Sequence, residues 1–135
     1  MKEGLLPWLK EQGHVVEDMG AKDFSEDDDY PEYAQLVSNK VVEDAIHNRG
    51  ILLCGSGIGM AVAANKISGV RAANIQSVDI AKVARNDDDI TILALGSDFL
   101  SLEEAQAIVA TFLDTPFSGS ERHVRRIEKI KQLEQ

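Results

Sequence analysis

The fold of this chain is decided by residues 50–60, GILLCGSGIGM, where an apolar run passes into a glycine-rich turn. Residues 50–54 are apolar over the length of a strand, which is typical of a parallel strand buried on both faces. After the turn, residues 60–66 read as a helix that ends near Gly69. Glycines allow positive φ, and a helix N-terminus presents free N–H groups. This order of elements therefore favours the binding of an anion at the turn.

Two features of this stretch have a structural as well as a functional explanation. A tight strand-to-helix turn needs small residues whatever its function, and the pattern matches neither the dinucleotide-binding nor the P-loop motif. Cys54 is the only cysteine of the chain. It is either a small buried hydrophobe or a base or nucleophile placed at a strand end beside a helix N-terminus. Its position favours the functional explanation, whereas for the glycine turn alone both explanations stay open.

The composition indicates one globular domain in a reducing compartment. The chain has 135 residues, of which 44% are hydrophobic, and this length suits a single domain. A single cysteine excludes an intramolecular disulfide framework. No apolar run reaches the roughly eighteen residues of a membrane helix, and residues 1–14 are too short and too charged for a signal peptide. We therefore expect a cytoplasmic protein that does not bind membranes.

The charge distribution excludes one class of partner and suggests another. The net charge is −9, so binding to nucleic acid is not expected. Residues 122–131, RHVRRIEKIK, nevertheless carry five of the fourteen Lys and Arg residues, which indicates a local anionic target. Arg122 and Arg126 are four residues apart and share one helical face, an arrangement that suits a phosphate. The alternative is a solvated helix whose cations pair with the acidic surface.

Two acidic runs raise the question of a metal site. Residues 26–29 and 87–89 are rich in aspartate, but neither run has the spacing of an EF-hand loop. His14 and His47 have no partner ligands at zinc spacing. Solvated loop charge is the better explanation, and no metal site is predicted.

Alternating apolar segments predict a parallel sheet covered by helices on both faces. The expected strands are 14–19, 50–54, 70–75 and 90–95, and the expected helices are 1–12, 31–46, 60–66, 78–85, 102–113 and 121–133. The order is unusual in one respect, because the chain opens with a helix that should follow a strand in a doubly wound fold. Either the sheet starts in an unusual way, or a strand before Met1 has been lost.

Five separate stretches carry a family resemblance along essentially the whole chain. They are DYP (29–31), GILLCGSGIGMAVAANKISGVRAA (50–73), AKVAR (81–85), LALG (93–96) and RHVRRIEKI (122–130). On these motifs the chain resembles the ribose-5-phosphate isomerase B family, which includes the subunits of galactose-6-phosphate isomerase. The block that begins at Cys54 is highly specific to this family.

The resemblance implies a fold and a reaction. The fold would be a Rossmann-like three-layer α/β/α sandwich over residues 1–135. The reaction would interconvert an aldose and a ketose phosphate, most directly ribose 5-phosphate and ribulose 5-phosphate. It would pass through a cis-enediolate without a metal or cofactor. Cys54 would be the base that moves a proton between C1 and C2, and Ser56 would hydrogen-bond the sugar. Backbone N–H groups of residues 55–59 would hold the developing oxyanion, as preorganised donors can.

The resemblance also implies the rest of the site. The other substrate-binding positions would be Tyr30, Gly55, Gly57, Ile58, Gly59 and Asp88. Arg122, His123 and Arg126 would bind the phosphate. In the family these last residues often reach a site made by the neighbouring subunit. A homodimer or larger homo-oligomer with a shared site is therefore expected, with the helix at about 121–133 reaching the partner.

Several positions depart from the family pattern. The family's first strand, which ends in Asp-His-Ala-Gly, has no counterpart here, and its absence would leave backbone unpaired in the strands at 15–19 and 50–54. Gln76 replaces a ring-opening histidine, Asp88 an asparagine and Asp98 a phosphate-binding arginine. One hypothesis is an isomerase whose recorded start is too late, Met1 being an internal methionine. The other is a catalytically weak or inactive relative that binds a phosphorylated sugar, or the partner subunit of an active enzyme.

Overall fold

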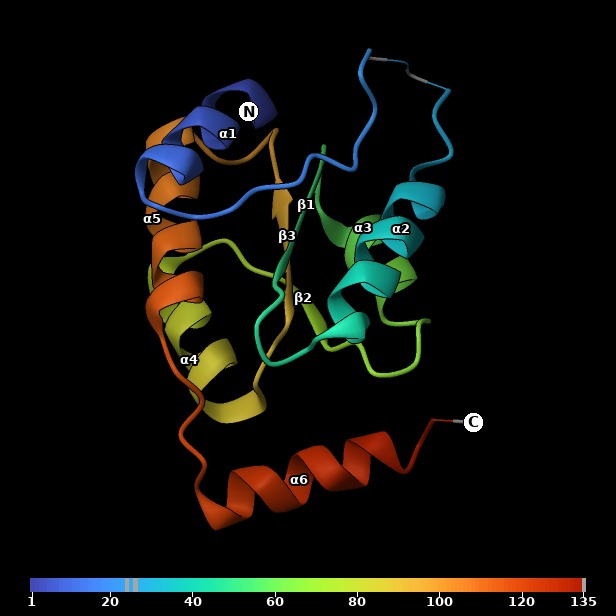
Figure 1. Cartoon of the computed structure of the whole chain (residues 1–135), viewed down its shortest axis with the longest axis vertical. Coiled ribbons are helices and arrows are strands. Elements are labelled where there is room, and N and C mark those ends of the chain that lie inside the picture. The colour runs from blue at the N-terminus through green and yellow to red at the C-terminus, as the bar shows by residue number, and fades with distance from the viewer. Residues whose placement is uncertain (24, 26, 135) are drawn as a thin grey trace.

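A parallel sheet lies between two layers of helices in the computed structural model, which describes residues 1–23, 25 and 27–134 (Figure 1). Glu26, which belongs to the first acidic run, lies outside the described residues. The elements are α1 (Lys2–Glu11), α2 (Tyr30–Glu43), β1 (Gly50–Cys54), α3 (Ile58–Ala64), β2 (Ala72–Asn74), α4 (Val78–Asp88), β3 (Ile92–Gly96), α5 (Leu102–Asp114) and α6 (Glu121–Lys131). The three-layer α/β/α sandwich expected from the sequence is confirmed.

The sheet has the strand order β1-β3-β2, and both pairs of strands are parallel. All five residues of β3 are buried, as its apolar sequence predicts for a central parallel strand. The register places Cys54 opposite Gly96. The carboxyl ends of β1 and β3 therefore meet at one edge of the sheet, which is where open α/β sheets bind their ligands.

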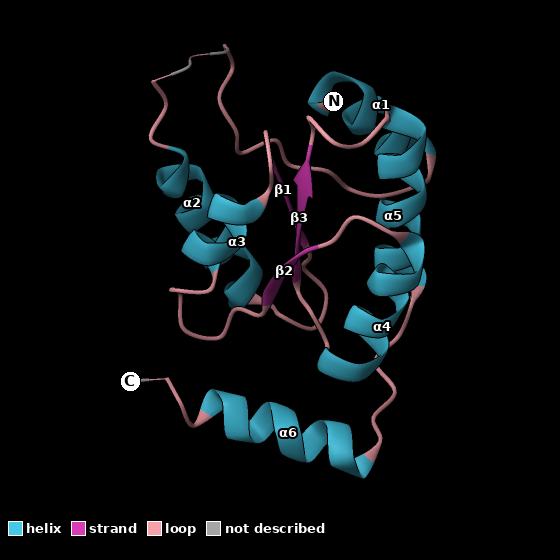
Figure 2. Ribbon diagram, turned by 180° about the vertical axis from the view of Figure 1, so that it is seen from behind, coloured by secondary structure: helices cyan, strands magenta, loops and turns pink. Residues whose placement is uncertain are grey.

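Side chains alternate across the sheet and build one core on each face. Leu93 and Leu95 of β3 pack with buried residues of α1, α4 and α5. Ile92 and Ala94 pack with α2 and α3 on the other face, and Cys54 lies against this second core. Figure 2 shows the two helical layers on opposite sides of the strands.

The last helix, α6, belongs to neither layer. It lies across the amino ends of the strands, at the opposite end of the molecule from the turn that follows β1 (Figures 1 and 2). His123 and Ile127 are its buried residues. Beyond its C-terminus, the Glu134 carboxylate accepts hydrogen bonds from the Gly69 N–H (2.8 Å) and from the Ser68 hydroxyl (2.7 Å). The contact with Gly69 is the main reason that the pKa of Glu134 is lowered.

One expected strand is wrong. Residues 14–19 form no strand, and Val15 is fully exposed. A strand needs a neighbour with which to exchange backbone hydrogen bonds, and within the described ranges β1 pairs only with β3. The described residues accordingly hold no strand before β1. The same ranges contain no helix with the length and apolarity needed to cross a membrane.

The other expected elements are present with shifted ends. The second helix ends at Glu43 rather than at residue 46, because the turn after it is closed by hydrogen bonds to Asp44. The strand expected at 70–75 is reduced to Ala72–Asn74. The helix expected at 78–85 runs on to Asp88, where Asp89 ends it in a left-handed conformation.

Candidate active site

The glycine turn after β1 is held in a shape that only glycine fits. Gly57 has φ of 79° and precedes the first residue of α3. A Cβ atom there would lie 2.8 Å from the Leu95 carbonyl carbon and 2.9 Å from Asn74 Oδ1. Positive φ and this close approach both exclude a side chain. The turn therefore packs directly on the neighbouring strand ends.

Cys54 points its thiol into this turn. Its Sγ accepts a hydrogen bond from the Gly57 N–H at 3.0 Å, and the residue is partly exposed. Its carbonyl oxygen accepts from the Ser97 N–H at 2.9 Å, which fixes the strand end. The Ser56 hydroxyl oxygen accepts from the Ile58 N–H at 3.2 Å. The expected catalytic pair, Cys54 and Ser56, thus lies on the same turn as the backbone donors.

Two further residues reach the turn from other elements. The ring of Tyr30, at the start of α2, covers Gly59, where an added Cβ would fall 2.6 Å from the ring carbon Cζ. Asp98 follows β3, and its N–H donates to the Gly55 carbonyl at 3.0 Å. Its carboxylate oxygen Oδ2 would lie 2.7 Å from a Cβ on Gly55. The structure therefore brings Tyr30 to the turn and also places a negative charge beside it.

Asn74 is a site residue that sequence reasoning missed. It ends β2, and its side-chain N–H donates to the Ser56 carbonyl at 3.0 Å. Its Oδ1 is buried and has no hydrogen-bond partner among the described residues. A polar residue at the end of a short apolar strand was the available signal, because the ends of parallel strands meet at one edge.

The remaining expected site residues lie at the opposite end of the molecule. Asp88 ends α4, four residues before the first residue of β3, while Cys54 lies opposite its last residue. The length of β3 alone separates them by about 13 Å. Arg122, His123 and Arg126 lie on α6, at the same end as Asp88. A single chain therefore does not bring the turn and the basic cluster together.

Within that cluster only the two arginines are exposed. His123 is 5% exposed, and its Nδ1 is 2.6 Å from the Ser118 hydroxyl. Its Nε2 accepts from the Arg122 Nε–H at 3.4 Å and lies 3.8 Å from an Asp87 carboxylate oxygen. His123 is thus used inside the chain, where it fixes the start of α6. Arg122 and Arg126 are exposed, and the Nε–H of Arg122 is held by His123.

Gln76 follows the carboxyl end of β2 and is exposed beside Glu104 of α5. Over the described part of the chain, no three His, Cys, Asp or Glu side chains gather closely enough to hold a metal ion.

The fold and the turn together define a class of protein. It is an α/β protein with a glycine turn at the carboxyl ends of a parallel sheet and a thiol that accepts a hydrogen bond from the backbone of that turn. Residues 1–130 match the model of the Ribose/Galactose Isomerase family. The chain belongs to this family, whose members are aldose–ketose isomerases, and is thus a sugar-phosphate isomerase by class.

Relatives resemble the chain over almost its full length. A probable ribose-5-phosphate isomerase B from Mycoplasma genitalium is 41% identical over 99% of this chain and 88% of its own. Ribose-5-phosphate isomerase B from Mycobacterium tuberculosis is 37% identical over 99% of this chain and 82% of its own. A D-erythrulose-4-phosphate isomerase from Pectobacterium atrosepticum is 34% identical over 99% and 87%.

Solved structures have the same fold. Ribose-5-phosphate isomerase B from Mycoplasma genitalium, solved with bound ribulose-5-phosphate, superimposes with a TM-score of 0.93 at 41% identity. The superposition covers 97% of this chain and 86% of that one. Ribose 5-phosphate isomerase from Thermotoga maritima superimposes with a TM-score of 0.89 at 42% identity, covering 98% and 89%.

Proposed function

We propose that this chain interconverts ribose 5-phosphate and ribulose 5-phosphate, with Cys54 as the base. The observation that carries the proposal is the hydrogen bond of 3.0 Å from the Gly57 N–H to the Cys54 sulfur. It holds the thiol next to the backbone donors of the turn, so one site offers both a proton acceptor and a cradle for developing negative charge.

The proposed reaction moves one proton at a time. The Cys54 sulfur takes the proton from C2 of the open-chain aldose, so that the C–H bond breaks and an S–H bond forms. The electron pair becomes a cis-enediolate, whose oxygens accept from the N–H groups of residues 55–59. The same proton returns to C1, and the hydroxyl proton of O2 passes to O1. Ser56 hydrogen-bonds the sugar, and Tyr30 closes one side of the turn.

The phosphate of the substrate is expected away from Asp98. The carboxylate of Asp98 lies beside Gly55, and two negative charges at that place would repel each other. Arg122 and Arg126 are exposed and suit a phosphate dianion, but they lie at the other end of their own chain. We therefore propose that they reach the turn of a neighbouring subunit in a homodimer or larger homo-oligomer.

Conversion of ribose 5-phosphate by the purified chain and by Cys54→Ala tests the proposal. The wild-type chain should form ribulose 5-phosphate. Loss of a general base should lower kcat of the variant by about a hundred- to ten-thousandfold. Circular dichroism shows whether Cys54→Ala is folded. Full activity in a folded Cys54→Ala protein would remove the cysteine from the mechanism.

The substrate itself is tested by a panel. Erythrulose 4-phosphate belongs in it, because a relative is named for that substrate, as do the 6-phosphates of allose and galactose. These sugars differ by a hydroxyl group or a carbon atom. Such a difference changes kcat/KM because it changes how well the sugar fits the pocket. The relatives named above are all described as isomerases, so they give no support to an inactive binding protein. A wild-type chain that converts none of these sugars would reopen that alternative.

A further inference from the structure

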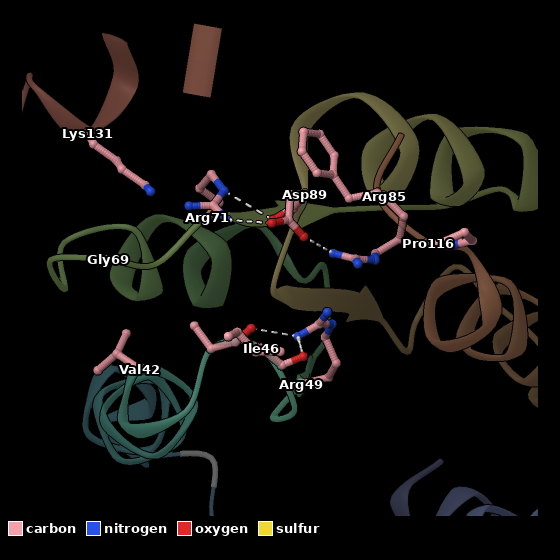
Figure 3. A pocket seen from close by; sticks show the side chains of 11 residues that line it. Val42, Ile46, Arg49, Gly69, Arg71, Arg85, Asp89, Pro116 and Lys131 are labelled. Carbon is pink, nitrogen blue, oxygen red and sulfur yellow. Dashed lines mark hydrogen bonds and ion pairs between the residues drawn. The ribbon is translucent and has the colours of Figure 1, made fainter. Parts of the chain in front are cut away.

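A cavity lies at the end of the sheet opposite the glycine turn. Its volume is about 620 Å³. Arg49 directly precedes β1, Arg71 directly precedes β2, and Asp89 lies shortly before β3. The amino ends of parallel strands meet at one edge of the sheet. These residues therefore line one cavity, between that edge and α6 (Figure 3).

Positive charge dominates the polar side of this cavity. Its charged lining residues are Arg49, Arg71, Arg85, Lys131 and Asp89. Asp89 pairs with two of the four cations, Arg85 at 2.7 Å and Arg71 at 3.2 Å. Lys131 pairs with Glu128 on the exposed side of α6. The Glu134 carboxylate accepts a hydrogen bond from Gly69, a lining residue, and the charges of Arg71 and Lys131 contribute to its lowered pKa. The four cations thus stand against three carboxylates, Asp89, Glu128 and Glu134, which leaves a small excess of positive charge.

Among the four cations of the cavity, Arg49 has the fewest negatively charged partners. Its guanidinium donates only to backbone carbonyls, those of Ala45 and Asn48 at 2.9 and 2.8 Å and, more weakly, Ile46. It forms an ion pair with none of the described carboxylates. Burial first, and then the positive charge of Arg85, lower the pKa of Arg49. An anion in the cavity would relieve this repulsion.

The apolar wall of the cavity lies next to the cations. It consists of Val42, Ala45, Ile46, Pro116 and Phe117, and Arg49 donates hydrogen bonds to the carbonyls of Ala45 and Ile46 in it. A bare inorganic ion would leave these side chains in contact with water, whereas an organic group attached to the anion would cover them. Cations beside apolar side chains match one chemical class of ligand.

We propose that the cavity binds a small organic phosphate, with its phosphate group between Arg49, Arg71 and Lys131 and its apolar portion against Ile46 and Phe117. A phosphate group would neutralise this small excess and would suit the guanidinium forks. The cavity is distinct from the proposed catalytic turn, which lies at the other end of the strands. Binding there does not depend on the proposed isomerase activity.

Calorimetric titration with phenyl phosphate and with inorganic phosphate, at matched ionic strength, tests the site. We expect phenyl phosphate to bind more tightly than inorganic phosphate, because only its ring contacts the apolar wall. Arg49→Gln should weaken the binding of phenyl phosphate about tenfold, since one charge-assisted hydrogen bond is lost. Lys131→Gln, an exposed change on α6, should weaken it in the same direction even if Arg49→Gln is poorly folded.

Lys40→Gln is the control for general electrostatics, because it removes an exposed cation that pairs with Glu43 outside the cavity. It should retain the affinity of the wild-type chain for phenyl phosphate. The active site would also bind a phosphate ester, so every titration is repeated in a chain with both Arg122→Ala and Arg126→Ala, which lacks the proposed phosphate ligands of that site. The proposal is overturned if this background does not bind phenyl phosphate, or if adding Arg49→Gln and Lys131→Gln to it leaves the affinity unchanged.

Discussion

Asn74 ties the end of one strand to the turn that follows another. Its side-chain N–H donates to the Ser56 carbonyl, and this bond fixes the turn that carries Cys54. Asn74→Ala should leave the chain folded but lower kcat about tenfold, the equivalent of about 1.4 kcal/mol. The KM should change less, because the thiol is displaced rather than the phosphate ligands. Asn39→Ala, on the exposed face of α2, is the control, and equal kcat values for the two variants would contradict this role.

Comparing alanine substitutions at Gly57 and Gly119 measures how much close packing around the turn adds to the cost of a side chain. Both have positive φ, 79° and 68°, but a Cβ on Gly119 would meet nothing within 4 Å. Gly119→Ala should cost about 1 kcal/mol of unfolding free energy, from the backbone conformation alone. Gly57→Ala should cost about 3 kcal/mol, because its Cβ also overlaps the ends of β2 and β3. Urea denaturation measures both, and equal costs would show that the turn can relax.

The residues of the turn could be predicted from the sequence because they are contiguous. Cys54, Ser56 and the glycines lie in one motif, and the structure brings them together as expected. Asn74 could not be found in this way, since its contact depends on which strands are neighbours. The contacts of His123 within the chain could not be predicted for a similar reason. Its ring is covered by Ser118 and Asp87, and neither contact has a signature in the sequence. Its expected contact with phosphate stays a prediction.

Among the elements, α4 ends in an unusual way. Asp89 is its C-cap residue and the only described residue other than glycine with positive φ, at 47°. This conformation lets one carboxylate pair with Arg85, which is 4% exposed, and with Arg71. Aspartate and asparagine both tolerate the left-handed region. Asp89 therefore joins the end of α4 to the start of β2.

Asp89→Asn should destabilise the chain by about 2 to 3 kcal/mol. Asparagine keeps the backbone conformation, but the buried Arg85 loses its charge partner. Glu43→Gln, which breaks only the exposed pair with Lys40, should change the stability little. Thermal unfolding of both variants measures the difference. A melting temperature of Asp89→Asn equal to that of Glu43→Gln would show that the ion pairs contribute nothing.

Most helices and strands could be predicted from the periodicity of the apolar residues, whereas the strand predicted at 14–19 does not form. Its local sequence has strand character, but a strand forms only beside another strand. No strand among the described residues pairs with it, and β1 pairs only with β3. Propensity could thus identify β1 and β3, which pair with each other, but it does not tell whether a segment has a strand beside it.

For the whole molecule, the main finding is that the expected site is divided. Cys54 and the glycine turn lie at the carboxyl ends of the strands, while Arg122 and Arg126 lie on α6 at the amino ends. The order of motifs along a chain does not tell which end of the sheet each one reaches, and only the family resemblance implied that Arg122 and Arg126 reach a site on a neighbouring subunit. A shared site between two chains would reunite the two parts.

Mixing two inactive variants tests this central claim most directly. Cys54→Ala lacks the proposed base, and a chain with both Arg122→Ala and Arg126→Ala lacks the proposed phosphate ligands. In a mixed dimer with shared sites, one of the two sites combines the intact turn of one chain with the intact arginines of the other. The account predicts that each variant alone has little ribose 5-phosphate isomerase activity, and that unfolding and refolding them together restores about a quarter of the wild-type rate. A mixture as inactive as its components, with mixed dimers present, would contradict it.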